Sequence, residues 1–290
     1  MLFYRLLGRL PLAVLYRLAW LGYLLLYYVA GYRQAVVRDN LRAAFPEKSA
    51  GEITALAKRF YRQLADTGVE IIRAGAMRRE EFGERVTLLN PELLRRYSND
   101  LRDSDIILTI HQGNWEWMLH GASAALGVPL DPVYKPLHNA ALDRYIFEVR
   151  SRFGSRPLPM DQAARDILRR RREFRLFVMV ADQSPIRRER SYWTRFLHRD
   201  AAFYLGAETI AKVTGFPVLF AQCRRPRRGH YEVEFHELAQ PPHAADGHEI
   251  TERYVRLAER AIRAEPHSWL WSNRRWKRQP PADQPRQQRC

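Results

Sequence analysis

The feature that most constrains the fold of this chain is the stretch DIILTIHQGNWEW at residues 105–117. Its apolar, β-branched first half predicts a buried strand, which ends on a histidine, a glycine and an asparagine before a helical pattern begins. His111 therefore stands at the carboxyl end of a strand. In an open α/β sheet this edge faces the crevice where ligands usually bind, so we expect the imidazole to reach a substrate.

Glu116 follows His111 by five residues, in the first turn of the predicted helix. Gly113 allows the chain to turn between them, so we expect the carboxylate to come back under the imidazole ring. There it would accept the proton on Nδ1, fix the tautomer and leave Nε2 to remove a proton from a hydroxyl. The alternative is a histidine that caps a turn and a glutamate on a solvated helix face.

Strands and helices alternate beyond this stretch. The pattern predicts a short strand in residues 128–136, a helix in 138–154, a second buried strand in 176–180, then loop, helix and strand in 193–220 and an amphipathic helix in 249–264. This alternation predicts an α/β fold with a mainly parallel central sheet flanked by helices. Asp182 and Gln183 follow the second buried strand, so Asp182 would face the same crevice as His111, unless it only caps the next turn.

Residues 10–32 carry one charge and are rich in leucine, tyrosine and tryptophan. Their number is close to the ~20 residues that a bilayer-spanning helix needs, so they predict an N-terminal membrane helix. Arg5, Arg9 and Arg17 fall in one sector of a helical wheel, which also permits a helix lying in the interface. A buried core helix is the remaining alternative. We expect an anchor helix at 1–32, a main domain at 33–278 and a flexible tail at 279–290.

The His-x4-Glu pair within HQGNWEW resembles the motif of the glycerolipid acyltransferase superfamily, and in particular that of the lipid A late acyltransferases of bacterial inner membranes. Four further stretches match this family: NLRAAFPE before a long helix that Ser49 and Glu52 open as a capping box, an arginine before Gly154, ADQSP at 181–185, and PHSWLWSNRRWKR at 266–278. The resemblance spans about residues 36–278. Asn273 stands where the family usually has a histidine, which puts any role of that histidine in doubt.

The resemblance implies an acyltransferase domain at 33–278 and a set of site residues. The catalytic residues would be His111 and Glu116, and the substrate-binding or oxyanion residues Arg150, Asp182, Gln183 and Asn114. Arg152 is the alternative to Arg150 for the arginine that the family needs. No serine elbow or placed cysteine stands beside His111, which favours direct acyl transfer over a covalent acyl-enzyme. Phe196, Phe203 and Tyr204 are candidates for the lining of an acyl-chain channel, and equally for core positions.

The resemblance also implies the partners: acyl carrier protein as carrier of the acyl donor, and a lipid A precursor, a phosphorylated and hydroxyacylated glucosamine disaccharide, as acceptor. It implies no metal, no cofactor and a place at the bacterial inner membrane with the active domain on the cytoplasmic side. The net charge of +16 suits an acidic carrier, a phosphorylated lipid and an anionic phospholipid membrane. The candidate contact patches are Arg169–Arg172, Arg224–Arg228 and the cluster Arg274, Arg275, Lys277 and Arg278; each is otherwise a solvated surface.

Two other functions fit parts of the sequence. Within enzymes, the acceptor is another glycolipid, such as a mannosylated phosphoinositide, or an aminolipid, because related acyltransferases share the His-x4-Asp/Glu core. Outside enzymes, the chain is a basic membrane-bound adaptor or a nucleic-acid binder, whose binding would depend steeply on salt and not on His111 or Glu116. The sequence contains no recognisable nucleic-acid module, and its hydrophobic amino terminus disfavours that class.

Overall fold

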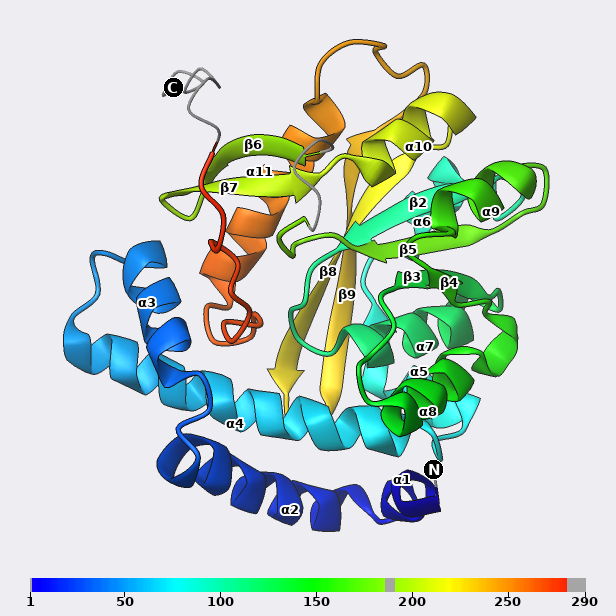
Figure 1. Cartoon of the computed structure of the whole chain (residues 1–290). Coiled ribbons are helices and arrows are strands. Elements are labelled where there is room, and N and C mark those ends of the chain that lie inside the picture. The colour runs from blue at the N-terminus through cyan, green and yellow to red at the C-terminus, as the bar shows by residue number, and fades with distance from the viewer. Residues whose placement is uncertain (1, 186–190, 281–290) are drawn as a thin grey trace.

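The computed structural model describes residues 2–185 and 191–280, and Figure 1 shows the arrangement of its elements. Seven strands form one sheet in the order β1-β9-β8-β2-β5-β3-β4. All neighbouring pairs in this sheet are parallel except β8 and β9, which are antiparallel. The prediction of an α/β fold with a mainly parallel central sheet flanked by helices is confirmed.

The elements have the following bounds. The strands of this sheet are β1 (Val86–Leu88), β2 (Asp105–Thr109), β3 (Leu130–Tyr134), β4 (Leu158–Pro159), β5 (Leu176–Val180), β8 (Val218–Arg227) and β9 (His230–Ala239). The α-helices are α1 (Leu2–Gly8), α2 (Leu12–Leu24), α3 (Gln34–Ala44), α4 (Ala50–Ala74), α5 (Arg79–Arg85), α6 (Pro91–Tyr97), α7 (Trp115–Leu126), α8 (Ala140–Arg150), α9 (Ala163–Arg169), α10 (Gly206–Thr214) and α11 (Glu249–Ala264). The strands expected at 128–136 and 176–180 and the helices expected at 138–154 and 249–264 are present.

Strand β2 lies at the centre of the sheet and is buried on both faces. Ile106 and Leu108 belong to the core that α4, α10 and α11 cover, whereas Ile107 belongs to the core that α5, α7 and α8 cover. Successive side chains of a strand point to opposite faces, so a strand covered on both sides needs an uninterrupted apolar run. This requirement explains the apolar, β-branched character of residues 106–108.

The long helix α4 crosses the end of the sheet at which β2, β5 and β8 finish (Figure 1). The expected capping box opens it: the Ser49 hydroxyl accepts the Glu52 N–H at 3.3 Å, and the Glu52 carboxylate accepts the Ser49 N–H at 2.8 Å. Two arginines at the end of β8, Arg225 and Arg228, form ion pairs with Asp66 of α4. The carboxyl end of β8 therefore meets α4 (Figure 1).

The amino-terminal helix α2 lies along α4 on the side away from the sheet (Figure 1), and the π-helical segment Leu25–Val29 continues it. Leu15, Ala19, Tyr23 and Tyr27, spaced four residues apart, are buried. The segment Leu12–Val29 is long and apolar enough to cross a membrane, judged by length and composition, but the face of the helix that carries those four residues lies inside the molecule.

One expected element is wrong. The segment before residue 206 was expected to be a loop, but it forms an antiparallel pair of strands outside the main sheet, β6 (Ser191–Phe196) and β7 (Arg199–Tyr204). Leu197 and His198 make the tight turn between them with positive φ angles of 49° and 68°. Such turns normally carry Asn-Gly or Asp-Gly, and this sequence has neither there. The tail expected at 279–290 lies, from residue 281 onward, outside the described residues.

Candidate active site

The segment between β2 and α7 forms a tight turn that we call the catalytic turn, residues 110–114. Gly113 has a φ of +63°, and a Cβ there would lie 2.9 Å from both the carbonyl oxygen and the Sγ of Cys223. Only glycine fits this close approach in the left-handed conformation. Residues 266–278, which we call the closing segment, hold the turn from the other side. Leu270 N–H donates to the His111 carbonyl, and Gly113 N–H donates to the Ser268 carbonyl.

The partner of the His111 ring is Asp182. His111 Nδ1 lies 2.5 Å from Asp182 Oδ1, and the backbone N–H of His111 donates to Asp182 Oδ2 at 3.1 Å. Thr109 of β2 pairs with Val180 of β5, so His111 and Asp182 each stand two residues past a paired position of two parallel strands. Equal offsets at the same sheet edge bring the two side chains together, as the predicted shared crevice required.

The expected contact between Glu116 and His111 Nδ1 is wrong. Glu116 instead forms a two-point ion pair with Arg150 at the end of α8: Arg150 Nε lies 2.9 Å from Oε2, and Nη2 lies 2.5 Å from Oε1. The sequence analysis paired Nδ1 with Glu116, the acid nearer along the chain. The pairing of β2 with β5 instead brings Asp182 closer to the ring in space. Burial alone would raise the pKa of Glu116, but the Arg150 guanidinium holds it below its usual range.

Asp182 is 2% exposed and receives a third donor, the indole N–H of Trp269 at 2.6 Å. Burial opposes ionisation of this carboxyl, yet His111 and the three N–H donors hold its pKa below the ordinary value. A carboxylate that accepts the proton on Nδ1 leaves Nε2 with its lone pair. Trp269, in the closing segment, is a site residue that the sequence analysis did not single out.

Gln183 occupies the other side of the ring, with its side-chain nitrogen 3.2 Å from His111 Nε2. With the ring proton on Nδ1, this amide donates to the lone pair that a general base would use. A substrate hydroxyl that approaches His111 would replace the Gln183 amide there. The structure thus places the Gln183 amide beside His111 Nε2.

Arg150 and Arg152 have different surroundings, which decides between the two candidates for the site arginine. The Arg150 side chain is only partly buried, at 17% exposed; it pairs with Glu116 and lies over the Tyr134 ring at 5.4 Å. Arg152 donates to the backbone carbonyls of Ala74 and Met77 at 2.5 and 2.6 Å, near the end of α4. Arg150 therefore belongs to the candidate site, and Arg152 secures the end of a helix.

Asn114 points away from the crevice, contrary to the expected substrate contact. Its side-chain oxygen accepts the Trp117 N–H at 2.9 Å as the N-cap of α7, and its nitrogen donates to Glu70 at 2.9 Å. Glu70, on α4, is fully buried and also accepts hydroxyl hydrogen bonds from Tyr16 and Tyr231 at 2.7 and 2.5 Å. Glu70 thus ties the catalytic turn to α2, a link that the sequence analysis missed.

A narrow groove opens at His111 between α4, the catalytic turn and the closing segment. It is lined by Phe60, Gln63, Leu64, Thr67, His111, Gly113, Trp115, His267, Ser268, Trp269 and Leu270. Phe196 and Phe203 lie outside it, buried in the core against the Arg275 side chain. The proposed channel role of these two phenylalanines is therefore wrong, and the core alternative holds for them.

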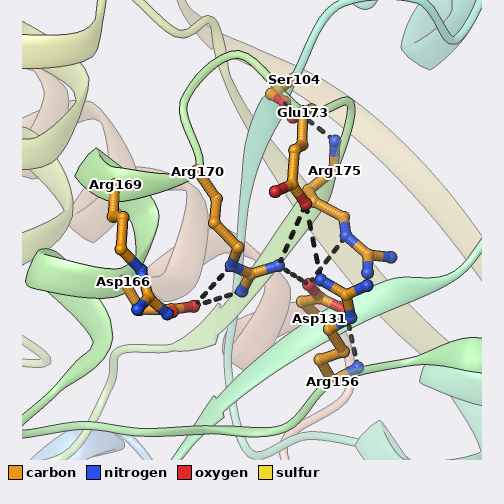
Figure 2. Close-up of polar contacts among 8 residues, drawn as sticks. All are labelled: Ser104, Asp131, Arg156, Asp166, Arg169, Arg170, Glu173 and Arg175. Carbon is orange, nitrogen blue, oxygen red and sulfur yellow. Dashed lines mark hydrogen bonds and ion pairs between the residues drawn. The ribbon is translucent and has the colours of Figure 1, made fainter.

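Several arginines of the basic patches expected to contact partners form ion pairs within the protein. Figure 2 shows Arg170 between Asp166 and Asp131, with Arg175 also directed at Asp131. This cluster lies at the amino end of the strands, where Asp131 is level with Ile106, so it is about 16 Å from His111 at about 3.3 Å per residue. In the other two patches, Arg225 and Arg228 pair with Asp66, and Arg275 is 1% exposed.

Among residues 2–185 and 191–280, no group of three or more His, Cys, Asp and Glu side chains is placed to hold a metal ion. The one cysteine among these residues, Cys223, is buried, and burial raises the pKa of its thiol to about 12. It is therefore a poor nucleophile at neutral pH. The arrangement instead suits proton abstraction by His111 beside an apolar groove.

Comparison with known proteins agrees with this chemistry. A family model described as bacterial lipid A biosynthesis acyltransferase matches residues 1–278. The matched span includes the amino-terminal helices, the central sheet and the closing segment that carries Trp269. No curated protein matches the chain.

Proposed function

The chain belongs to the bacterial lipid A biosynthesis acyltransferases, and we propose that it moves a fatty acyl chain from acyl carrier protein to a hydroxyl of a lipid A precursor by direct transfer. The observation that carries this mechanism is the His111–Asp182 pair at 2.5 Å, at the edge of a groove with apolar walls. A histidine held in this way is suited to activate an alcohol. The acyl donor arrives on its carrier, so the reaction needs no cofactor.

In the proposed reaction, His111 Nε2 removes the proton from the acceptor hydroxyl, which has displaced the Gln183 amide. The hydroxyl oxygen attacks the thioester carbonyl and forms the new C–O bond, and Asp182 stabilises the imidazolium. The C–S bond of the tetrahedral intermediate then breaks, and the imidazolium gives its proton to the departing thiolate. A base of this kind is typically worth about 10² to 10⁴ in rate, so alignment of the two substrates must supply much of the remainder.

Arg150 is the proposed electrostatic partner of the developing oxyanion. Glu116 engages its Nε and Nη2 atoms and so fixes the plane of the guanidinium, while Nη1 is the group that the pair does not use. A preorganised donor of this kind needs no reorganisation during the reaction. Glu116 acts in this proposal by orienting Arg150, which replaces the contact with His111 expected from the sequence.

We also propose that the protein lies on an anionic phospholipid membrane through α1 and α2, at the cytoplasmic face of the inner membrane. The outward face of these helices exposes Leu2, Phe3, Leu6, Leu18, Trp20, Leu21, Leu25, Tyr28 and Val29. The opposite face of α2 packs along α4, where Arg62 lies over the rings of Trp20 and Tyr23. If α2 spanned the membrane, it would have to separate from α4 or bring the cationic side chains of α4, such as Arg62, into the bilayer. A position in the plane of the membrane is therefore favoured.

One experiment tests the reaction. Purified protein is incubated with acyl carrier protein loaded with fatty acid and with a panel of acceptors: a lipid A precursor, a mannosylated phosphoinositide and an aminolipid. Mass spectrometry of the products should show one added acyl chain on the lipid A precursor, and none with a folded His111→Ala variant. Transfer by that variant at the wild-type rate would refute the role of His111, and acylation of another acceptor alone would correct the substrate.

A second experiment tests the membrane position. The contribution of Trp20 to fluorescence, taken as the difference between the wild-type protein and a Trp20→Phe variant because the chain has seven tryptophans, is measured with vesicles of phosphatidylglycerol and phosphatidylethanolamine that carry quenchers at shallow or deep positions along the acyl chain. An in-plane helix predicts quenching by the shallow probe. Stronger quenching by the probe at the bilayer centre would indicate a spanning helix.

A further inference from the structure

Gln63 on α4 is a buried polar side chain whose hydrogen-bonding groups have no partner in the described structure. The residue is 4% exposed, and both its side-chain nitrogen and its side-chain oxygen are buried without a hydrogen bond. Burying an amide without partners is destabilising, so such groups in folded proteins usually have a role that compensates for the cost.

The position of Gln63 relates it to the active site. Phe60, Gln63, Leu64 and Thr67 have the spacing of one helical face, and all four line the groove at His111. The Thr67 hydroxyl donates to the Gly113 carbonyl at 3.4 Å, which sets this face of α4 directly against the catalytic turn. Gln63 lies on the same face, one helical turn before Thr67.

The rest of the groove wall is largely apolar. Phe60 and Leu64 flank Gln63 on α4, and Trp115, Trp269 and Leu270 face them from the other walls. A buried amide among these apolar side chains fits a ligand that is mostly hydrocarbon but carries a polar group along its length. The glutamine oxygen can accept from an N–H group and its nitrogen can donate to a carbonyl, and a secondary amide offers both of these groups.

We propose that Gln63 is a substrate-binding residue whose side-chain oxygen accepts a hydrogen bond from the N–H of a secondary amide adjoining an acyl chain. This inference rests on the proposed function, in which two groups have that chemistry: the linkage of an amide-bound acyl chain on the glucosamine acceptor, and the pantetheine arm of the carrier protein. Binding of this amide at Gln63 aligns the neighbouring reacting group of the substrate with His111 Nε2.

Gln63→Met tests the proposal, since methionine has a similar length and shape but no hydrogen-bonding group. The melting temperature should rise by a few degrees because an unpaired buried amide is removed, while kcat/KM should fall about tenfold or more because the substrate loses its partner. A purely structural glutamine could not move stability and activity in opposite directions. Gln63→Leu repeats the measurement if the methionine variant folds poorly.

Two measurements identify the source of the amide. An increase in KM for the acceptor with KM for the acylated carrier unchanged assigns Gln63 to the acceptor, and the reverse result assigns it to the pantetheine arm. In addition, a medium-chain N-acylglucosamine should raise the melting temperature of the wild-type protein more than the matching O-acyl ester does. The Gln63→Met variant should not distinguish the two ligands.

A matched control is Gln34→Met, because the Gln34 amide donates to the Tyr27 carbonyl and so already has a partner. This substitution should lower the melting temperature and leave transfer unchanged. The proposal is overturned if wild-type protein acylates its acceptor and Gln63→Met does so with the same kcat/KM for both substrates. Absence of transfer by the wild-type protein would instead count against the proposed function, and the N-acylglucosamine comparison would still decide the role of Gln63.

Discussion

Replacing Asp182 by asparagine alters the atom on which the proposed base depends and leaves the shape of the site almost unchanged. Asp182 accepts three N–H groups, from the His111 backbone, His111 Nδ1 and Trp269 Nε1. Asparagine has one acceptor oxygen. If this oxygen keeps the backbone and Trp269 donors, which share Oδ2, the amide nitrogen faces Nδ1 and makes that nitrogen an acceptor. The ring proton then sits on Nε2, and the lone pair that should activate the hydroxyl is lost.

The expected loss in kcat is about 10²- to 10⁴-fold, the contribution typical of a positioned general base. This corresponds to about 3 to 5 kcal/mol in the activation barrier. KM should change little, because Asp182 is 2% exposed and acts on the substrate only through His111. The folded state should lose stability as well, because a buried charge-assisted hydrogen bond is worth about 1.5–3 kcal/mol.

The assay is single-turnover transfer from acylated carrier protein, measured together with thermal unfolding of the same samples. Asp131→Asn serves as the control, because Asp131 is a fully buried carboxylate at the opposite end of the sheet that binds Arg170 and Arg175. This control should lose stability but keep its rate in the folded fraction. Wild-type turnover by a folded Asp182→Asn variant would refute the reasoning, because it would mean that Nδ1 needs no carboxylate.

Three further outcomes follow from named contacts. Glu116→Gln leaves the partly buried Arg150 charge uncompensated, so the free energy of unfolding should fall by about 1.5–3 kcal/mol and turnover should drop, with chemical denaturation and the transfer assay as readouts. Tyr16→Phe removes a 2.7 Å hydrogen bond to Glu70; it should cost about 1 kcal/mol and lower kcat while vesicle binding by α2 stays the same, and a loss of vesicle binding would contradict it. Burial raises the pKa of Asp105 from 3.8 to about 8, so between these values the native state holds a proton that the unfolded chain has lost. Stability should therefore fall by up to about 1.4 kcal/mol per pH unit as pH rises through this window, and Asp105→Asn should flatten that dependence in denaturation curves.

The central part of the fold was predictable because its pattern is local. The middle of β2 (residues 106–108) and all of β5 are apolar runs, and α7 begins directly after the asparagine that caps it. The crevice could also be located, since the carboxyl ends of parallel strands meet at one edge. To predict which carboxylate contacts His111, the strand register must be known as well. The pairing of Thr109 with Val180 gives Asp182 this role, and separation along the sequence cannot reveal a pairing between residues 71 positions apart.

Arginine content was the least reliable guide, because the surroundings of a guanidinium decide its role. Arg275 lies in a run that suggested a binding surface, yet it is 1% exposed and lies over the Phe203 ring at 4.2 Å. Arg170 likewise stands in a run of four arginines but is buried between two aspartates. A planar cation with several donors can stack on rings and bind carboxylates in the interior, so a run of arginines does not by itself indicate a surface.

The face of α4 that borders the site carried a signal in the sequence that can be stated in physical terms. Apolar periodicity from Ile53 to Leu64 predicts which side of this helix is buried, and a helix that only packed against a core would continue that side with apolar residues. Here the buried side continues instead with Gln63, Asp66, Thr67 and Glu70, all 7% exposed or less. Buried polar groups require partners, so a helix whose buried stripe changes from apolar to polar must there contact something other than a hydrophobic core. Asp66 and Glu70 meet arginines of β8, Thr67 meets the catalytic turn, and Gln63, the residue left without a partner, is where the bound substrate is expected.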